Sequence, residues 1–282
     1  MSRLAVKYKR EVWMHLGIIG YGNIAESLTK LLESQPVEKI TVLVRTTALE
    51  RARTKLQSSK AANTIEVTTD LADVLSAKPD LVIECAGHSA VEDLGPRILG
   101  SGITLLLVSI GALATYEVMA KLRQAADDGD ATLVLPAGAI GGIDLLAALA
   151  PMGDLKVCYR GTKPPAAWKG TPASDLLDLN TLSGPNVFFS GTARQAAREY
   201  PKNANVAATL ALAGAGFDET AVDLVADPAA TGNQHAYEVI SPVCRYSIEI
   251  ENTASGANSK TSVTTIYSVL REINRFRNPV VI

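Results

Sequence analysis

The feature that most constrains the fold is a glycine turn that joins an apolar segment to an amphipathic one near the start of the chain. The run His15–Ile19 is apolar, residues 20–25 read G-x-G-x-x-A, and residues 23–34 place apolar side chains on one helical face. A strand, a glycine turn and a helix in this order are typical of the first unit of a dinucleotide-binding sheet.

Each position of the turn has a physical role in holding a pyrophosphate. Gly20 permits the tight turn, Gly22 lets the backbone come close, and Ala25 packs against the strand. The helix N-terminus, at Asn23 and Ile24, offers N–H groups to the phosphates. We therefore count Gly20, Gly22, Asn23 and Ile24 as cofactor-binding residues. The alternative is a glycine turn needed only for packing.

The same alternation continues to residue 136. Further apolar runs at 40–45, 64–68, 80–85, 104–109 and 132–135 are predicted strands. Helices are predicted at 23–34, from an N-cap at Asp70 to residue 77, and at 116–126 after an N-cap at Thr115. Strands that alternate with helices predict a parallel sheet and an α/β, Rossmann-type dinucleotide-binding domain.

After Gly138 the pattern changes. A glycine-rich turn and helix at 138–149 precede predicted strands at 156–162, 186–190, 221–226, 236–239 and 244–250, with helices at 192–200 and 206–213. Consecutive strands predict a second domain of α+β type with a mixed sheet. A last amphipathic helix at 260–276 is expected to pack back on the first domain.

The predicted organisation therefore has three parts. Residues 14–138, with 259–282 packing back, form the dinucleotide-binding domain. Residues 139–258 form the substrate, catalytic and dimerisation domain, and residues 1–13 form a flexible N-terminal tail without the apolar segment of a signal peptide.

Composition excludes several other classes of protein. The chain has 282 residues with 27 Lys and Arg against 29 Asp and Glu, so a net charge of −2 gives no attraction to nucleic acid or anionic membranes. No apolar run approaches the roughly 20 residues that span a bilayer. Cys85, Cys158 and Cys244 are too widely spaced for a zinc motif and indicate reduced thiols in a cytoplasmic protein. No metal site is expected.

The end of the second predicted strand bears on the choice of cofactor. An NAD-type site would place Asp or Glu there, but this chain has Arg45 followed by Thr46 and Thr47. A guanidinium next to two hydroxyls suits a 2′-phosphate, so NADP is expected alongside NAD. The alternative is a solvated Arg at a strand end.

Histidine is the commonest proton-handling group, and the chain has three. His15 lies at the amino end of the first strand, away from ligands, and is expected to be structural. His88 follows the fourth strand, whereas His235 is predicted in a polar turn before a strand of the second domain. We favour His235 as the catalytic residue; the alternatives are His88 and that neither histidine is catalytic.

Residues 200–206 place Lys and two Asn side chains at the start of an apolar helix. The amides are either simple caps, or Asn205 reads the nicotinamide carboxamide while Asn203 faces an anionic substrate. Basic groups for a dicarboxylate are available at Arg160, Lys163 and Lys260.

Taken together, these segments resemble the L-aspartate dehydrogenase family along nearly the whole chain from Met14. The resemblance lies in GYGNIA (20–25), DLVIECAGH (80–88), VSIGAL (108–113), GAIGGID (138–144), YPKNANVAA (200–208), and ADP (226–228) with His235 seven residues beyond. The segment 200–208 is the most specific of these, whereas many dehydrogenases share the glycine turn.

The resemblance implies a reversible, NAD(P)-dependent oxidative deamination of L-aspartate. The product would be iminoaspartate, which hydrolyses to oxaloacetate and ammonia or serves NAD biosynthesis. It further implies that His235 is the active-site histidine, that Ala139 and Asn205 contact the cofactor, and that the enzyme is a homodimer. Ala86 is counted with the cofactor-binding residues, and Lys163 and Asn203 with the substrate-binding ones.

Two segments depart from the family's pattern. Residues 239–244 read VISPVC where a Gly-rich, Phe-containing stretch is expected, and residues 258–262 read NSKTS in place of NPKTS. A close relative acting on another small diacid therefore stays open. So do an enzyme of the dihydrodipicolinate reductase or homoserine dehydrogenase kind and a non-catalytic dinucleotide sensor.

Overall fold

A computed structural model describes residues 14–280 apart from 202, 253 and 256–257. The predicted tail at 1–13 lies outside the described residues. In the described part, each helix is too short or too polar to span a bilayer.

Sheet A is a six-stranded parallel sheet with the order β3-β2-β1-β4-β5-β6. Its strands are β1 (His15–Ile19), β2 (Val37–Leu43), β3 (Ala62–Thr68), β4 (Leu81–Glu84), β5 (Leu105–Leu107) and β6 (Leu133–Val134). The two central strands, β1 and β4, are buried almost throughout because helices cover both faces. Chain connectivity reverses direction between β1 and β4, and ligands bind outside the carboxyl ends of such a pair.

Helices α1 (Asn23–Leu32), α2 (Leu49–Leu56), α3 (Leu71–Ser76), α4 (His88–Leu99) and α5 (Tyr116–Gly129) connect these strands. Asp70 caps α3 as predicted, because its side chain accepts from the backbone N–H of Ala72 at 2.9 Å. Thr115 occupies the cap position of α5 without a side-chain cap bond.

The C-terminal helix α10 (Val263–Arg277) packs against α1 and belongs to the core of sheet A. Its buried residues Ile266, Val269 and Ile273 share a hydrophobic cluster with Leu16 and Leu28. We therefore call sheet A with α1–α5 and α10 the sheet A unit. The predicted start of this helix at residue 260 is wrong, since residues up to 262 pair as β13 (Asn258–Ser262) with β12 (Ala254–Ser255).

Sheet B has five strands in the order β11-β10-β7-β9-β8. They are β7 (Lys156–Lys163), β8 (Asn186–Thr192), β9 (Thr220–Ala226), β10 (Asn233–Ile240) and β11 (Arg245–Asn252). Only β7 and β9 run parallel, so this sheet is mixed. The predicted fold class, a Rossmann-type unit plus an α+β unit with a mixed sheet, is confirmed.

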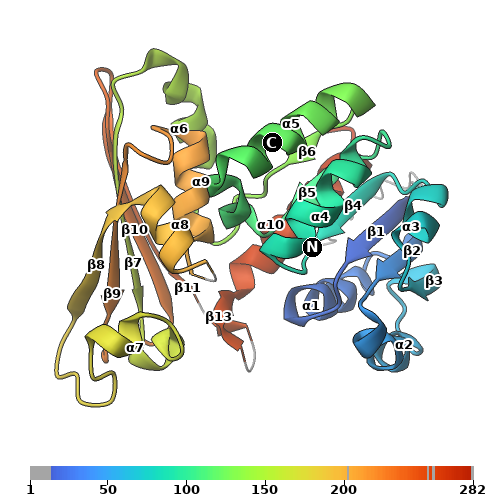
Figure 1. Ribbon diagram of the computed structural model, residues 1–282, viewed down its shortest axis with the longest axis horizontal. Helices are drawn as coiled ribbons and strands as arrows, with labels where there is room; N and C mark the ends of the chain where they lie inside the picture. The colour runs from blue at the N-terminus through green and yellow to red at the C-terminus, as the bar shows by residue number, and fades with distance from the viewer. Residues whose placement is uncertain (1–13, 202, 253, 256–257, 281–282) are drawn as a thin grey trace, which may run out of the picture.

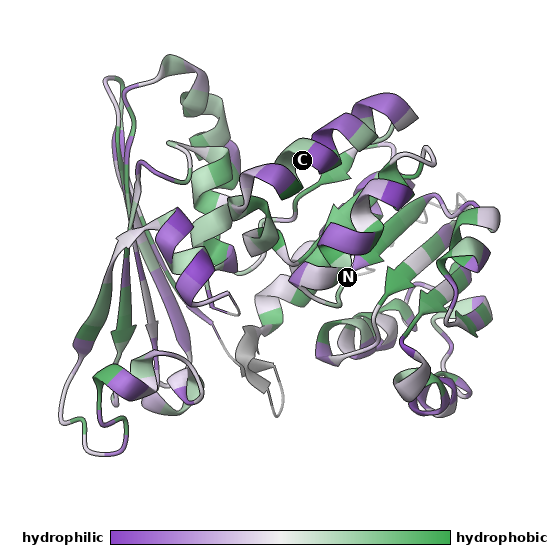
Figure 2. Ribbon diagram, in the orientation of Figure 1, coloured by the Kyte–Doolittle hydropathy of each residue, from purple (hydrophilic) through white to green (hydrophobic). Residues whose placement is uncertain are grey.

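Helices cover one face of sheet B, the face towards the sheet A unit (Figure 1). They are α8 (Ala193–Glu199) and α9 (Asn205–Ala213), with α6 (Ile143–Leu149) beside α9 and α7 (Ala173–Leu176) near the end of the sheet. The opposite face carries ion pairs, Arg160 with Asp223 and Arg245 with Glu238. Figure 2 shows the contrast between the apolar strands of sheet A and the polar outer faces of its helices.

Two predicted placements are corrected. His235 does not lie in a turn, because β10 begins at Asn233 and pairs His235 with Gly161 and Ile250. Strand β2 ends at Leu43, so Arg45 lies beyond it, at the cap of a short 3-10 turn (Thr46–Ala48).

Candidate active site

The β1–α1 turn is shaped to accept a phosphate group. Gly20 has φ +86°, and a Cβ on it would lie 2.9 Å from the Cβ of Ala86. A Cβ on Gly22 would meet nothing within 4 Å, so the space before α1 is open. Gly22 is the N-cap of α1 and provides no side-chain cap, which leaves helix N–H groups for an anion. These residues fit a dinucleotide pyrophosphate.

A buried carboxylate shapes the loops beside this turn. Glu84, the last residue of β4, accepts through Oε1 from the backbone N–H of Ala86 at 2.6 Å and of Gly87 at 2.7 Å. It also accepts from the N–H of Ser109 at 3.0 Å and from its hydroxyl at 3.1 Å. Burial raises the pKa of Glu84 although these bonds favour the charged form. Glu84 therefore ties the loop after β4 to the loop after β5.

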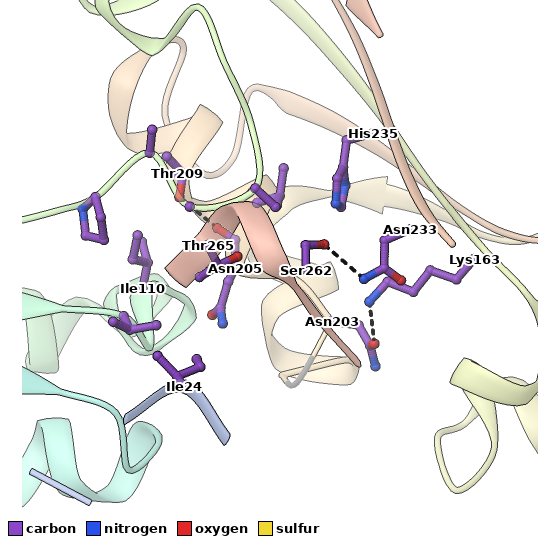
Figure 3. A pocket seen from close by; sticks show the side chains of 16 residues that line it. Ile24, Ile110, Lys163, Asn203, Asn205, Thr209, Asn233, His235, Ser262 and Thr265 are labelled. Atoms are coloured by element: carbon purple, nitrogen blue, oxygen red, sulfur yellow. Dashed lines mark hydrogen bonds between the residues drawn. The ribbon is translucent and has the colours of Figure 1, made fainter. Parts of the chain in front are cut away.

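A pocket lies between the two units, next to this edge of sheet A (Figure 3). The sheet A unit contributes Ile24, Val108, Ile110 and, from α10 and the residue before it, Ser262 and Thr265. The sheet B unit contributes Lys163, Asn203, Asn205, Val206, Thr209, Asn233 and His235, and residues 136–139 join the two. A ligand in this pocket would touch both units.

His235 points into the pocket from β10 and is only 3% exposed. Its Nδ1 lies 2.7 Å from the hydroxyl of Tyr159 on β7. Its Nε2 is buried without a hydrogen-bond partner among the described residues. Desolvation by burial, with a smaller effect from the charge of Lys163, lowers the pKa of His235 to about 3. The imidazole is therefore neutral at pH 7.

Next to His235 lies a buried group of polar side chains. The ammonium of Lys163 donates to Oδ1 of Asn203 at 2.9 Å and lies 5.4 Å from the centre of the Trp168 ring. This leaves Nδ2 of Asn203 buried without a partner among the described residues. Asn233 donates to the hydroxyl of Ser262 at 3.1 Å, and its Oδ1 is likewise unsatisfied. Unsatisfied buried polar atoms are costly, so their gathering here indicates a polar ligand.

Asn205 and His88 lie close together at the sheet A side. Asn205 Oδ1 accepts from the N–H of Gly111 at 2.9 Å. A Cβ on Gly111 would lie 3.0 Å from both Asn205 Oδ1 and His88 Nε2, so a larger residue there would be tight against both side chains. His88 is the first residue of α4 and does not line the pocket. His15 hydrogen-bonds to Thr41 at 2.8 Å at the amino end of β1.

The structure brings some of the predicted residues together and leaves others apart. The pocket is lined by Ile24, Ala139, Lys163, Asn203, Asn205 and His235. Gly20, Gly22, Asn23, Arg45 and Ala86 lie outside this lining, along the carboxyl edge of sheet A. Ala139 is buried, and its carbonyl accepts from Asn252. Arg45 is exposed.

Two further basic candidates were predicted, Arg160 and Lys260. Arg160 lies on the outer face of sheet B, paired with Asp223 at 3.1 Å, so it does not serve the pocket. Lys260 lies in β13. Within the described ranges, no three His, Cys, Asp or Glu side chains gather as a metal site would require.

Four further residues belong to the site or border it but were not predicted from the sequence: Tyr159, Asn233, Ser262 and Glu84. Glu84 could have been predicted from the sequence, because it is a lone carboxylate at the end of an apolar strand. No sequence pattern identifies Tyr159 or Asn233, because their roles depend on how distant strands pair.

Known families match both halves of the chain. Residues 144–276 match the family described as aspartate dehydrogenase, C-terminal, and residues 20–136 match the homoserine dehydrogenase NAD-binding domain. The L-aspartate dehydrogenase of Ralstonia pickettii is 42% identical over 261 residues, which is 92% of this chain and 96% of that protein. That of Acinetobacter baumannii is 40% identical over 256 residues, 91% and 95% of the two chains.

Solved structures agree with these matches. The aspartate dehydrogenase of Thermotoga maritima superposes with a TM-score of 0.73 at 28% identity and covers 95% of this chain and 99% of its own. A hyperthermophilic archaeal homoserine dehydrogenase, at 12% identity and a TM-score of 0.56, covers 95% and 99% and shares the fold. Identity of this extent over nearly the full length places the chain in the L-aspartate dehydrogenase family.

Proposed function

We propose that the pocket between the two units binds L-aspartate against a nicotinamide dinucleotide and carries out its reversible oxidative deamination to iminoaspartate, which hydrolyses to oxaloacetate and ammonia. The observation that supports this most is the buried group of Lys163, Asn203 and His235. It presents an ammonium and an amide N–H₂ at the place where the cofactor edge of sheet A meets sheet B. Such donors suit the carboxylates of a small diacid.

Each of these residues has a proposed role. Lys163 and Asn203 hold a substrate carboxylate. His235 either orients the substrate or activates the water that attacks iminoaspartate. When bound, the nicotinamide would accept a hydride from the substrate Cα. Because the pocket is largely buried, the charges of Lys163 and of the substrate attract each other more strongly than in water.

The cofactor residues follow the glycine turn and the pocket edge. Gly20, Gly22, Asn23 and Ile24 hold the pyrophosphate, with Ala86 packed against Gly20. Asn205 uses its Oδ1 for Gly111, so its amide N–H₂ serves the nicotinamide carboxamide beside Ala139. We propose that the enzyme accepts NADP alongside NAD, since exposed Arg45 stands where an NAD-type site carries a carboxylate.

We also propose how the chain divides these roles between its two units. Residues 14–138 with 259–282 bind the cofactor, and residues 139–258 bind the substrate and form a homodimer. We propose that the protein is cytoplasmic, because its three cysteines are free thiols.

The reaction is tested by following the absorbance of the reduced nicotinamide with purified protein, oxaloacetate, ammonium and NADH or NADPH, and in reverse with L-aspartate. Consumption that requires ammonium is expected. Consumption without ammonium would indicate simple keto reduction and contradict the proposal. Turnover of an aldehyde or a cyclic imine, but not of aspartate, would favour a homoserine dehydrogenase-like or dihydrodipicolinate reductase-like enzyme. Dinucleotide binding without any turnover would favour a sensor.

The cofactor proposal is tested with Arg45→Ala. We expect this variant to weaken NADPH binding by about 10-fold or more and NADH binding little, because a charge-assisted contact to the 2′-phosphate is lost. Dissociation constants from fluorescence titration measure both effects, with Arg53→Ala on the exposed face of α2 as the control. A larger loss of affinity for NADH than for NADPH would mean that Arg45 does not bind the 2′-phosphate.

A further inference from the structure

The partner of His235 reaches it diagonally across two paired strands. In the β7–β10 ladder, His235 lies opposite Gly161, and Tyr237 lies opposite Tyr159. Tyr159 and Gly161 are two residues apart and share the buried face of β7. The Tyr159 side chain therefore runs along its own strand, over Gly161, to bring its hydroxyl 2.7 Å from Nδ1 of His235. The two rings are nearly parallel, with an interplanar angle of 20°.

Gly161 is what makes this path possible. A Cβ on Gly161 would lie 2.6 Å from the Tyr159 hydroxyl oxygen and 3.1 Å from the ring carbon that carries it. Any other residue at this position would push the hydroxyl away from His235. The contact between Tyr159 and His235 therefore depends on the absence of a side chain at Gly161.

The position of the shared proton follows from what each group can do. Tyr159 is buried, and burial raises its pKa, so its hydroxyl keeps its proton. Among the described residues that hydroxyl bonds only to His235. If Nδ1 carried the imidazole proton, the phenol hydrogen would be buried without an acceptor. With the proton on Nε2, the hydroxyl donates to Nδ1, and the Nε2–H is the one group of the pair still without a partner among the described residues.

We propose that Tyr159 is a positioning residue that, together with Gly161, holds neutral His235 in the tautomer whose Nε2–H faces the pocket. Nε2 is the His235 atom that has no partner in the described part of the protein. It therefore meets the ligand as a hydrogen-bond donor.

This assignment narrows the two roles left open for His235 and, in that respect, rests on the proposed function. A nitrogen that carries a proton cannot take one from water, and the lone pair on Nδ1 is already used by Tyr159. His235 therefore orients the substrate, by donating to a carboxylate or carbonyl oxygen, and is not the base for the hydrolytic water. Lys163, the nearby cation whose charge acts on His235, disfavours the imidazolium and so supports the neutral form.

The tautomer is measured directly by nitrogen-15 NMR of the imidazoles in the full-length protein without substrate. The chain has three histidines, so the His235 signals are assigned by their loss in His235→Gln. We expect a protonated Nε2 and an unprotonated, hydrogen-bonded Nδ1 near pH 7. In Tyr159→Phe, the Nδ1 signal should move to that of an unprotonated nitrogen without a hydrogen bond. A proton on Nδ1 in the wild type, or an unmoved Nδ1 signal in Tyr159→Phe, would overturn the proposal.

Kinetics test the positioning role with two variants that disturb the contact differently. Tyr159→Phe removes the hydroxyl and keeps the ring, whereas Gly161→Ala keeps the hydroxyl and displaces it. We expect both to lower kcat/KM for L-aspartate by about 10- to 100-fold with unchanged dinucleotide affinity. The control is Tyr267→Phe, which removes the hydroxyl of an exposed tyrosine on α10 that does not line the pocket.

The two kinds of failure are distinguishable. Wild-type kcat/KM in Tyr159→Phe or Gly161→Ala would overturn the positioning role. The absence of aspartate turnover in the wild-type protein would contradict the proposed function instead. The NMR experiment needs no substrate, so it would still determine the tautomer.

Discussion

Lys163 is a cation in a place where proteins seldom bury one. It is 4% exposed, yet it is held by the Asn203 amide oxygen and faces the Trp168 ring. Burying an ammonium is costly, so its position at a pocket between two units is best explained by an anionic ligand.

Replacing Lys163 separates ligand binding from folding. Lys163→Met keeps the length of the side chain and removes the charge. We expect KM for L-aspartate to rise by about 100-fold, because a buried charge-assisted contact is lost, while dinucleotide affinity and stability are retained. Initial rates against aspartate concentration measure this, and Lys156→Met, exposed on the same strand, is the control. An unchanged KM would remove Lys163 from the substrate site.

His235 should also make the free energy of unfolding depend on pH. Its pKa is about 3 in the folded protein, against an ordinary value of 6.5. Between these values the unfolded chain binds a proton that the folded protein does not, so stability falls as the pH falls through this window. From pH 7 to about pH 5, this single group should account for about 2 kcal/mol. Urea unfolding at both pH values should show a smaller loss in His235→Gln than in the wild type. Equal losses would contradict the neutral, buried imidazole.

At the scale of elements, local patterns and long-range pairing account for different parts of the fold. The glycine turn, α1 and the apolar strands of sheet A could be predicted because their hydrophobic periods are local. The start of β10 at Asn233 could not, because ladder pairs with Asn252 and with β7 extend that strand into polar residues. The Tyr159–His235 contact depends on the same register between segments 76 residues apart, so no local pattern could reveal it.

Glu84 links two elements that border the cofactor edge, and its replacement tests that link. Glu84→Gln places an amide N–H₂ against backbone N–H donors, so at least one of the four hydrogen bonds is lost. We expect a loss of about 2 kcal/mol in the free energy of unfolding and weaker binding of NADH and NADPH alike. Calorimetry of cofactor binding and urea unfolding measure both effects. Glu92→Gln, exposed on α4, is the control, and unchanged cofactor binding would confine Glu84 to a structural role.

In the whole molecule, the pocket exists only while the two units keep their relative position. The C-terminal helix α10 returns to the sheet A unit, and the hydroxyl of Ser268 in that helix accepts from the N–H of Gly138, where the chain leaves for sheet B. A second link joins α8 to α5. The guanidinium carbon of Arg194 on α8 lies 3.9 Å from the centre of the Tyr116 ring on α5, and the guanidinium donates to the carbonyl of Ala114.

Arg194 is therefore expected to couple stability to catalysis across the two units. Its guanidinium is held at 2.7 Å by Asp218, which also accepts from the Tyr116 hydroxyl, so one side chain joins α8 to α5. Arg194→Met keeps the aliphatic stem but removes the ion pair, the carbonyl bond and the cation–π contact. We expect Tm to fall by roughly 3–6 °C and kcat/KM to fall several-fold, because substrate and cofactor groups come from opposite units.

The matched control for this variant is Arg198→Met on the same helix, since Arg198 is exposed and pairs only with its neighbour Glu199 among the described residues. Thermal unfolding and steady-state rates of the two variants should diverge. If Arg194→Met lowers Tm but leaves kcat/KM intact, the α8–α5 link stabilises the fold without aligning the pocket, and α10 with the segment 136–139 must hold the two units in register alone. If both quantities fall together, the alignment of the catalytic pocket depends on a contact well outside it.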